Sequence, residues 1–283
     1  MHSSQVSSHR KIRAIIFDMD NTLFDFVAAK QHACQEVAKF LGRDDWEALF
    51  FCFLNSPHGF ESHENIKDYF DLCGLLEECS TRQTLGAQSE GRIHLPGGCS
   101  TSREACSTPP SSKEANRKVR DNLLADKSPY CNEVFARCCA IYEAEKVQVL
   151  SPYPGARETL AELRRRGFPL AVLTDAHNGN ALARLRKTDL FQYFDHVISF
   201  DMTGAKKPAP DAFLLALKLL QTLPSETLLV GDSLRRDIAP AQALGMITAY
   251  AAYGDRNVRA RDPPDCRPDY VLGSIEELVR LVK

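Results

Sequence analysis

Four short stretches of the sequence carry carboxylate, hydroxyl and ammonium groups, which proteins use as nucleophiles, proton donors and acceptors, and ligands for hard cations. In chain order these stretches hold Asp18, Asp20 and Thr22; Thr174 and Asp175; Lys207 and Pro208; and Asp232 and Asp237. Each alone has a plain structural explanation, such as an acidic turn, a helix cap or a solvated lysine. Their joint occurrence beside predicted strand and helix ends favours a shared site.

The elements that would position these groups alternate between strands and helices. The pattern predicts an almost continuously apolar strand over 12–17, and further strands over 169–174, 196–200, 227–230 and 247–250. Helices are predicted between them, over 156–166, 181–187, 210–221 and 237–244. This alternation indicates an α/β fold with a doubly wound, open parallel sheet. In such a sheet, ligands bind at the carboxyl ends of the strands, where the strand order reverses.

The middle of the chain, residues 26–150, lacks that alternation. Apolar spacing predicts helices over 26–41 and 132–146. Between them, residues 80–118 are rich in Ser, Thr, Gly and Pro and hold only three residues from Leu, Ile, Val and Phe. Such a segment buries too little apolar surface to offset its ordering entropy, so we predict a disordered insert. Residues 1–11 are predicted to form a flexible tail.

The ordered set Asp18-x-Asp20-x-Thr22, Thr174, Lys207-Pro208 and Gly231-Asp232-(x4)-Asp237 resembles the haloacid dehalogenase superfamily of Mg²⁺-dependent phosphohydrolases. The resemblance covers residues 12–25 and about 153–283. It implies a Rossmann-like core formed by residues 12–25 and 151–283. It also implies that residues 26–150 form a mainly helical cap, inserted after the first strand.

The resemblance also implies catalytic roles. Asp18 resembles the family's nucleophile, which forms an aspartyl-phosphate. Asp20 resembles its general acid and base, which protonates the leaving alcohol and then activates water. The family's dehalogenases have no alcohol to protonate and keep no acid at this place, so Asp20 favours phosphoryl transfer over cleavage of a carbon–halogen bond.

A magnesium site and a phosphate site follow from the same resemblance. The carboxylates of Asp18 and Asp232 and the backbone carbonyl of Asp20 would hold Mg²⁺, a hard cation that prefers oxygen ligands. Asp237 would bind the ion through water or orient its ligands. Lys207 would offset negative charge around Asp18. The groups expected to bind the phosphoryl group or the substrate are Thr22, Thr174, Asp175 and Lys207.

We therefore expect a Mg²⁺-dependent phosphatase that acts on a small phosphorylated metabolite, such as a nucleotide, phosphoglycolate or a sugar phosphate. Two alternatives stay open. One is a phosphomutase with the same core, which would yield an isomerised sugar phosphate in place of free phosphate. The other is a non-catalytic binding or regulatory protein that engages a partner through the cap.

Composition excludes several other classes. The 35 Lys and Arg residues nearly balance the 37 Asp and Glu residues, which argues against a general nucleic-acid binder. No apolar run approaches the roughly 18 to 20 residues that cross a bilayer, and residues 1–10 do not resemble a secretory signal. We expect a cytoplasmic protein whose ten cysteines are mostly reduced, buried thiols.

Two other polar positions near these stretches are open to more than one interpretation. Asp25 could sense the leaving group of a substrate, or it could cap the following helix. His177, with its neighbours Asn178 and Asn180, could line the mouth of a pocket, or belong to a plain polar loop.

Overall fold

The computed structural model describes residues 11–75, 129–256 and 266–282, with the side chains of 129–131 left out. The chain divides into two compact units, one of residues 1–29 and 147–283 and the other of residues 30–146. The insert predicted at 80–118 and the predicted N-terminal tail up to residue 10 lie outside the described residues.

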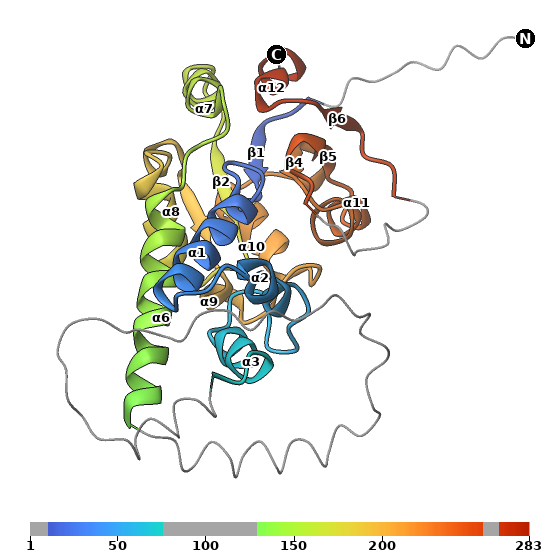
Figure 1. Cartoon of the computed structure of the whole chain (residues 1–283). Coiled ribbons are helices and arrows are strands. Elements are labelled where there is room, and N and C mark those ends of the chain that lie inside the picture. Colours follow the sequence, from blue (N-terminus) through green and yellow to red (C-terminus); the bar gives the residue numbers. More distant parts are fainter. Residues whose placement is uncertain (1–10, 76–128, 257–265, 283) are drawn as a thin grey trace, which may run out of the picture. The chain divides into compact units, whose positions relative to one another are not determined.

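The strands of the first unit form one parallel sheet, which has six strands in the described part of the chain. The strands are β1 (Ala14–Phe17), β2 (Leu170–Leu173), β3 (His196–Ile198), β4 (Thr227–Gly231), β5 (Ile247–Ala251) and β6 (Tyr270–Leu272). Their order is β3-β2-β1-β4-β5-β6, which confirms the predicted doubly wound sheet (Figure 1). The order reverses at β1, and such a reversal is where open α/β sheets place their ligands.

The register of β1 determines which side chains meet at that reversal. Phe17, the last residue of β1, pairs with Val172 of β2 on one side and Val230 of β4 on the other. All four residues of β1 are buried. The chain segments that follow these three strands therefore leave the sheet at the same edge, next to one another.

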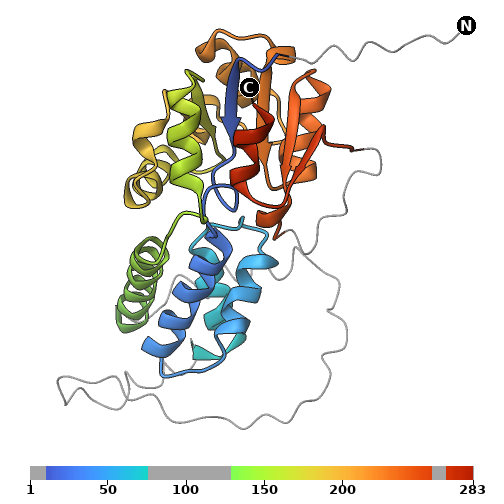
Figure 2. The same ribbon diagram turned by 90° about the horizontal axis from the view of Figure 1, so that it is seen from above.

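Helices cover both faces of this sheet (Figure 2). Ile15 and Phe17 point to a core that includes α7 (Ala156–Arg165), α8 (Asn178–Lys187) and α12 (Leu278–Leu281). Ala14 and Ile16 point to the opposite core, with α10 (Asp211–Leu220) and α11 (Ala239–Ala243). This alternation follows from the two-residue repeat of a strand. Because both faces are covered, the sequence of β1 is apolar throughout.

Within the first unit, the structure corrects the predictions at three places. The strand predicted over 196–200 ends at Ile198, and a short helix, α9 (Phe200–Thr203), follows it. The helix predicted over 237–244 begins instead as a π-helical turn, Leu234–Ile238, which continues into α11. Strand β6 was not predicted, because three residues at a sheet edge, two of them exposed, are too few to show a two-residue repeat.

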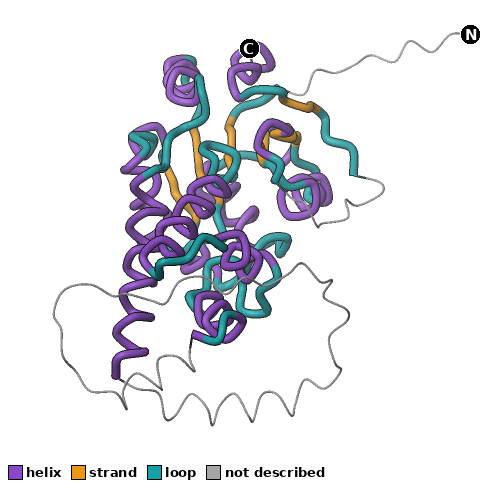
Figure 3. The backbone as a smooth tube through the Cα atoms, viewed as in Figure 1, coloured by secondary structure: helices purple, strands orange, loops and turns teal. Residues whose placement is uncertain are grey.

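The second unit is helical in its described residues (Figure 3). Its helices are α1 (Phe26–Phe40), which begins in the first unit, α2 (Trp46–Leu54), α3 (Glu64–Leu72) and α6 (Pro129–Gln148). The structure confirms the helices predicted over 26–41 and 132–146, whereas α2 and α3 were not predicted. The stacked rings of Phe53 and Tyr142, 4.6 Å apart, join α2 to α6. None of the described helices is both long enough and apolar enough to cross a membrane.

Candidate active site

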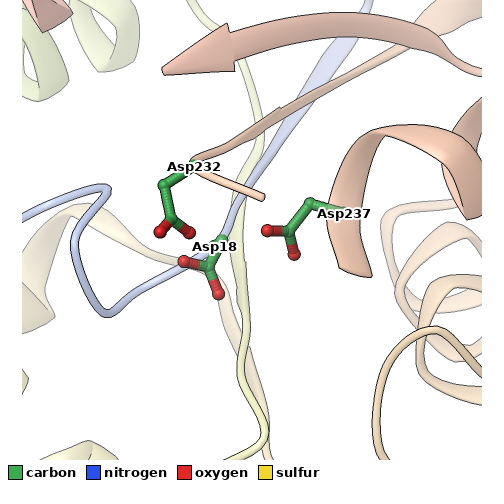
Figure 4. Close-up of side chains that lie close together, drawn as sticks. All are labelled: Asp18, Asp232 and Asp237. Atoms are coloured by element: carbon green, nitrogen blue, oxygen red, sulfur yellow. The ribbon is translucent and has the colours of Figure 1, made fainter. Parts of the chain in front are cut away.

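Three buried carboxylates converge where β1 and β4 end. Asp18 directly follows β1, and Asp232 directly follows β4. Asp237 lies in the π-helical turn that begins two residues after Asp232. One carboxylate oxygen from each residue lies within 4.8 Å of the others, and Figure 4 shows the three groups facing one another. Acids that are 219 positions apart along the chain (237 minus 18) thus form one cluster because their strands are neighbours.

Lys207 supplies a positive charge to this cluster. Its Nζ atom donates to Oδ1 of Asp18 at 2.5 Å and to Oδ1 of Asp237 at 2.6 Å. Burial by itself disfavours the charged lysine, but the negative charges of Asp18 and Asp237 outweigh that effect and raise the pKa of Lys207. The side chain is 2% exposed, so the ammonium stays charged only because these carboxylates surround it.

The pairing with Lys207 leaves part of the negative charge of the cluster uncompensated, and burial of that charge is unfavourable. Burial, together with the charges of Asp18 and Asp237, raises the pKa of Asp232 well above that of an ordinary aspartate. Burial also raises the pKa of Asp237, although Lys207 opposes part of the rise. Lys207 and the nearby Arg236, whose charges both favour the ionised acids, therefore do not fully offset the three buried carboxylates. Converging carboxylate oxygens with excess negative charge are the donor set that suits a hard divalent cation such as Mg²⁺.

A close backbone approach holds Asp237 in place. A Cβ atom at Gly231, the last residue of β4, would lie 2.6 Å from the Cβ of Asp237. Oδ2 of Asp237 accepts from the backbone N–H of Ser233 at 3.1 Å. The Ser233 hydroxyl in turn accepts from the N–H of Arg236 and caps the turn. Position 231, directly before Asp232, therefore requires a glycine, because any larger residue would collide with Asp237.

The loop after β1 fixes the other oxygen of Asp18. The hydroxyl of Thr22, which is fully buried, donates to Oδ2 of Asp18 at 3.0 Å. Between these two residues, Asn21 has a φ of 64°, a left-handed conformation that asparagine tolerates better than most residues. Its Oδ1 accepts from the N–H groups of Phe26 and Val27 and so caps α1. Both oxygens of Asp18 therefore have a donor, one from Lys207 and one from Thr22.

Two further predicted site residues follow β2. Thr174 is 3% exposed, and its Oγ1 accepts from the N–H of Ala176 at 3.1 Å. Asp175 accepts from the backbone N–H of Lys207 at 2.9 Å and so ties the β2 loop to the lysine loop. The peptide bond between Lys207 and Pro208 is cis. The described geometry gives Asp175 a clear part in placing Lys207, and its predicted contact with substrate stays a prediction.

Asp20 has an ion-pair partner that the sequence did not indicate. Nη1 of Arg184, in α8, donates to Oδ2 of Asp20 at 2.8 Å. The arginine side chain is 1% exposed and that of Asp20 is 22% exposed. Arg184 lies ten residues beyond Thr174 on a helix with three basic residues near its end, and nothing in that pattern distinguishes it from a solvated arginine.

The turn after β5 also contacts the Asp18 loop, again without a signal in the sequence. The hydroxyl of Tyr253 donates to the backbone carbonyl of Thr22 at 2.8 Å. The next residue, Gly254, is buried, and a Cβ atom there would overlap the backbone oxygen of Asn21. The turn therefore lies directly against the loop that carries Asp18, Asn21 and Thr22.

We expect Gly254→Ala to destabilise the folded protein by about 1 to 3 kcal/mol, the range for overpacking a tightly packed site. The added methyl group would overlap a backbone carbonyl, which cannot rotate away as a side chain can. Thermal and urea denaturation would measure the change. Gly179→Ala is the matched control, because a Cβ atom at Gly179 meets nothing within 4 Å. Equal stability of the two variants would contradict the described contact.

The structure shows the capping interpretation of Asp25, and the contact with a leaving group stays a prediction. Its Oδ1 accepts from the N–H of Ala28 at 2.9 Å, and its Oδ2 pairs with Arg256 at 2.7 Å. Asp25 thus caps the start of α1. His177 pairs with Asp201 at 2.6 Å, which joins the loop after β2 to α9. Both residues have structural contacts that account for their polarity.

Comparison with known families agrees with this geometry. A family model for haloacid dehalogenase-like hydrolases matches residues 12–245, which include all four motif stretches. The chain belongs to the haloacid dehalogenase-like hydrolases.

Relatives in two archaea give the resemblance more detail. The chain is 36% identical to a glyceraldehyde 3-phosphate phosphatase of Methanocaldococcus jannaschii over 164 residues, which are 58% of this chain and 70% of the relative. It is 27% identical to a ribulose-1,5-bisphosphate 5-phosphatase of Halopiger xanaduensis over 273 residues, 95% of this chain and 98% of the relative. For two further glyceraldehyde 3-phosphate phosphatases, the alignment spans 59% and 48% of the relative.

A solved structure shares the fold. The HAD-hydrolase YfnB of Bacillus subtilis, solved with bound magnesium, has a TM-score of 0.56 and 19% identity to this chain. The match covers 96% of this chain and 99% of that one. At 19% identity this match supports the fold only. The assignment to the family rests on the family model that matches residues 12–245.

Proposed function

We propose that this protein is a Mg²⁺-dependent phosphatase that hydrolyses a small phosphorylated metabolite through a phosphorylated aspartate. The observation that carries the proposal is the carboxylate of Asp18, which lies against Lys207 and within reach of the acids Asp232 and Asp237. The two archaeal relatives support the substrate class, because both are named for small phosphorylated sugars.

In the first step, a carboxylate oxygen of Asp18 attacks the phosphorus atom. The bond between phosphorus and the ester oxygen breaks, and Asp20 donates a proton to the leaving alkoxide. A phosphate monoester is a dianion, so a carboxylate repels it unless positive charge is near. Lys207, 2.5 Å from Asp18, offsets part of this repulsion. Thr22 keeps the Asp18 side chain in one orientation.

In the second step, Asp20 takes a proton from water as the water oxygen attacks the phosphorus atom. The bond between phosphorus and Asp18 breaks, and its electron pair returns to the carboxylate. Inorganic phosphate leaves, and Asp18 and Asp20 are ready for another cycle. Thr174, directly after the neighbouring strand β2, is proposed to donate to a phosphoryl oxygen. Asp175 is proposed to act mainly by placing Lys207.

The donor set also supports the magnesium part of the proposal. The carboxylates of Asp18 and Asp232 and the backbone carbonyl of Asp20 would hold the ion, with Asp237 bound through water. When bound, Mg²⁺ would withdraw negative charge from the phosphoryl oxygens. Residues 26–150 are proposed to serve as the cap that selects the substrate, on the basis of their helical character and their place between β1 and α7.

We expect phosphate release from at least one member of a panel of small phosphomonoesters in Mg²⁺, and loss of that release in EDTA. The panel should include glyceraldehyde 3-phosphate, phosphoglycolate, ribulose 1,5-bisphosphate and nucleoside monophosphates. A malachite-green assay would measure free phosphate, and re-addition of Mg²⁺ should restore the rate. Chromatography of the organic product serves as the control for isomerisation.

The outcomes separate the candidate functions. Free phosphate that depends on Mg²⁺ supports the phosphatase. An isomerised phosphate ester without free phosphate would support a phosphomutase in its place. Full activity in EDTA would contradict the magnesium assignment, and a chain with no turnover on the panel would contradict the proposed substrate class.

A further inference from the structure

Arg184 occupies a place where an apolar side chain is the ordinary choice. It lies on the buried face of α8, beside Ala181 and Leu185. Among the described residues it is the bulkiest of the fully buried side chains. A charged group is placed in such surroundings only with a compensating partner, because its desolvation is costly.

Two contacts of the guanidinium group bear on its orientation. It donates to Oδ2 of Asp20 at 2.8 Å, a charge-assisted hydrogen bond. Its central carbon lies 3.8 Å from the centre of the Phe26 ring, within the range of a cation–π contact. Arg184, Asp20 and Phe26 all belong to the first compact unit, so the arrangement is internal to it.

Stability alone does not account for this pair. Buried arginine–carboxylate pairs are often no more stabilising than apolar residues of similar size, because both charges lose their hydration. A leucine at position 184 would pack beside Ala181 and Leu185 without that penalty. What the arginine provides, and leucine would not, is a fixed direction for the Asp20 carboxylate.

We propose that Arg184 is a positioning residue that holds the Asp20 carboxylate in the orientation needed for proton transfer. The inference rests on the proposed function, in which Asp20 is the general acid and base. The second step depends on this orientation most directly. There a water oxygen bonds to phosphorus, its proton passes to an oxygen of Asp20, and the bond from phosphorus to Asp18 breaks.

An aryl phosphate separates this effect from a general loss of structure. Nitrophenolate is a weak base and leaves from p-nitrophenyl phosphate without a proton from Asp20. For this substrate, kcat/KM reports the phosphorylation of Asp18, whereas kcat includes the hydrolysis of the phosphorylated aspartate. In Arg184→Met we expect kcat to fall about 100-fold, and kcat/KM to change by no more than a few fold. KM then falls together with kcat.

Two further variants and an Asp20→Asn background sharpen the test. Arg186→Met is the matched control, because Arg186 is an exposed arginine of the same helix and is expected to keep both constants. Arg184→Lys retains the charge without the planar fork, and we expect it to lose about tenfold in kcat alone. If Arg184 acts through Asp20, then Arg184→Met should cause no further loss of kcat in Asp20→Asn.

Circular dichroism and thermal denaturation would establish that each variant is folded. If Arg184→Met does not fold, the kinetic constants of Arg184→Lys provide the test. Equal falls in kcat and kcat/KM would overturn the inference, as would an unchanged kcat or a full additional loss in the Asp20→Asn background. A wild-type protein that releases no phosphate from any substrate contradicts the proposed function and, with it, this inference. If the wild type is active but the Arg184 variants do not show the expected fall in kcat with kcat/KM retained, the inference is contradicted and the proposed function is not.

Discussion

Asp18→Asn is expected to lower the rate of phosphate release by about 10⁴-fold or more, the loss typical when a nucleophile is removed. Asparagine has nearly the same shape, but its amide is a poor nucleophile toward phosphorus. The substitution should not destabilise the folded protein. Asp18 is one of three buried carboxylates around Lys207, so removing its charge relieves repulsion on Asp232 and Asp237. The melting temperature is therefore expected to stay the same or to rise.

Asp189→Asn is a suitable control for this variant. Asp189 is an exposed aspartate of the same unit, and its φ of 56° is one that asparagine also adopts readily. We expect it to retain wild-type activity. Undiminished phosphate release by Asp18→Asn would remove Asp18 from the nucleophile role, whereas inactivity with a collapsed melting curve would show a structural role instead.

Lys207→Met is expected to affect both activity and stability. The variant leaves the carboxylates of Asp18 and Asp237 buried without their hydrogen-bonded cation. Loss of one partner of such a buried ion pair destabilises a protein by about 3 to 5 kcal/mol. We expect the rate to fall about 100- to 1000-fold, as for other preorganised groups that stabilise charge. Denaturation curves and phosphate release would measure the two effects.

Magnesium gives this prediction a second readout. Because the ion would replace part of the lost positive charge, Mg²⁺ should stabilise Lys207→Met more than it stabilises the wild type. Lys206→Met is the matched control, since Lys206 is an exposed lysine whose Nζ atom lies 5.4 Å from the centre of the Phe200 ring. A Lys207→Met variant as stable as Lys206→Met in EDTA would contradict the buried ion pairs described above.

The sequence predicts the central part of the fold well, and the reason is burial. Strands β1, β2 and β4 are covered on both faces, so they are buried throughout, almost wholly apolar, and stand out from the helices around them. Elements at the periphery lack this signal. Strand β6 has only three residues, two of them exposed, and no apolar run or alternation can indicate so short an edge strand.

The sequence also predicts which acids cluster, because residues that follow adjacent parallel strands must emerge together. Asp18, Asp232 and Asp237 were expected to share a site, and their carboxylates do converge. Lys207 was expected to offset the charge of Asp18, and the two groups are hydrogen-bonded. The roles of these residues in catalysis stay predictions until they are measured.

Arg184 and Gly254 could not have been found in the same way. The arginine pairs with a residue 164 positions away, and its helix position says nothing about whether it is buried or solvated. Gly254 is required by the backbone carbonyl of Asn21, a contact between two loops. Helix and strand periodicities describe faces of single elements, and neither describes how one loop lies against another.

The most direct test of the account is to locate the phosphoryl group during turnover. Asp20→Asn, mixed with p-nitrophenyl phosphate and Mg²⁺ and then quenched in acid, should accumulate phosphorylated protein because the second step is slowed. Mass spectrometry of peptides should place one phosphoryl group on Asp18, and hydroxylamine should remove it. Turnover with no phosphorylated residue, or with the phosphoryl group on any other residue, would contradict the account.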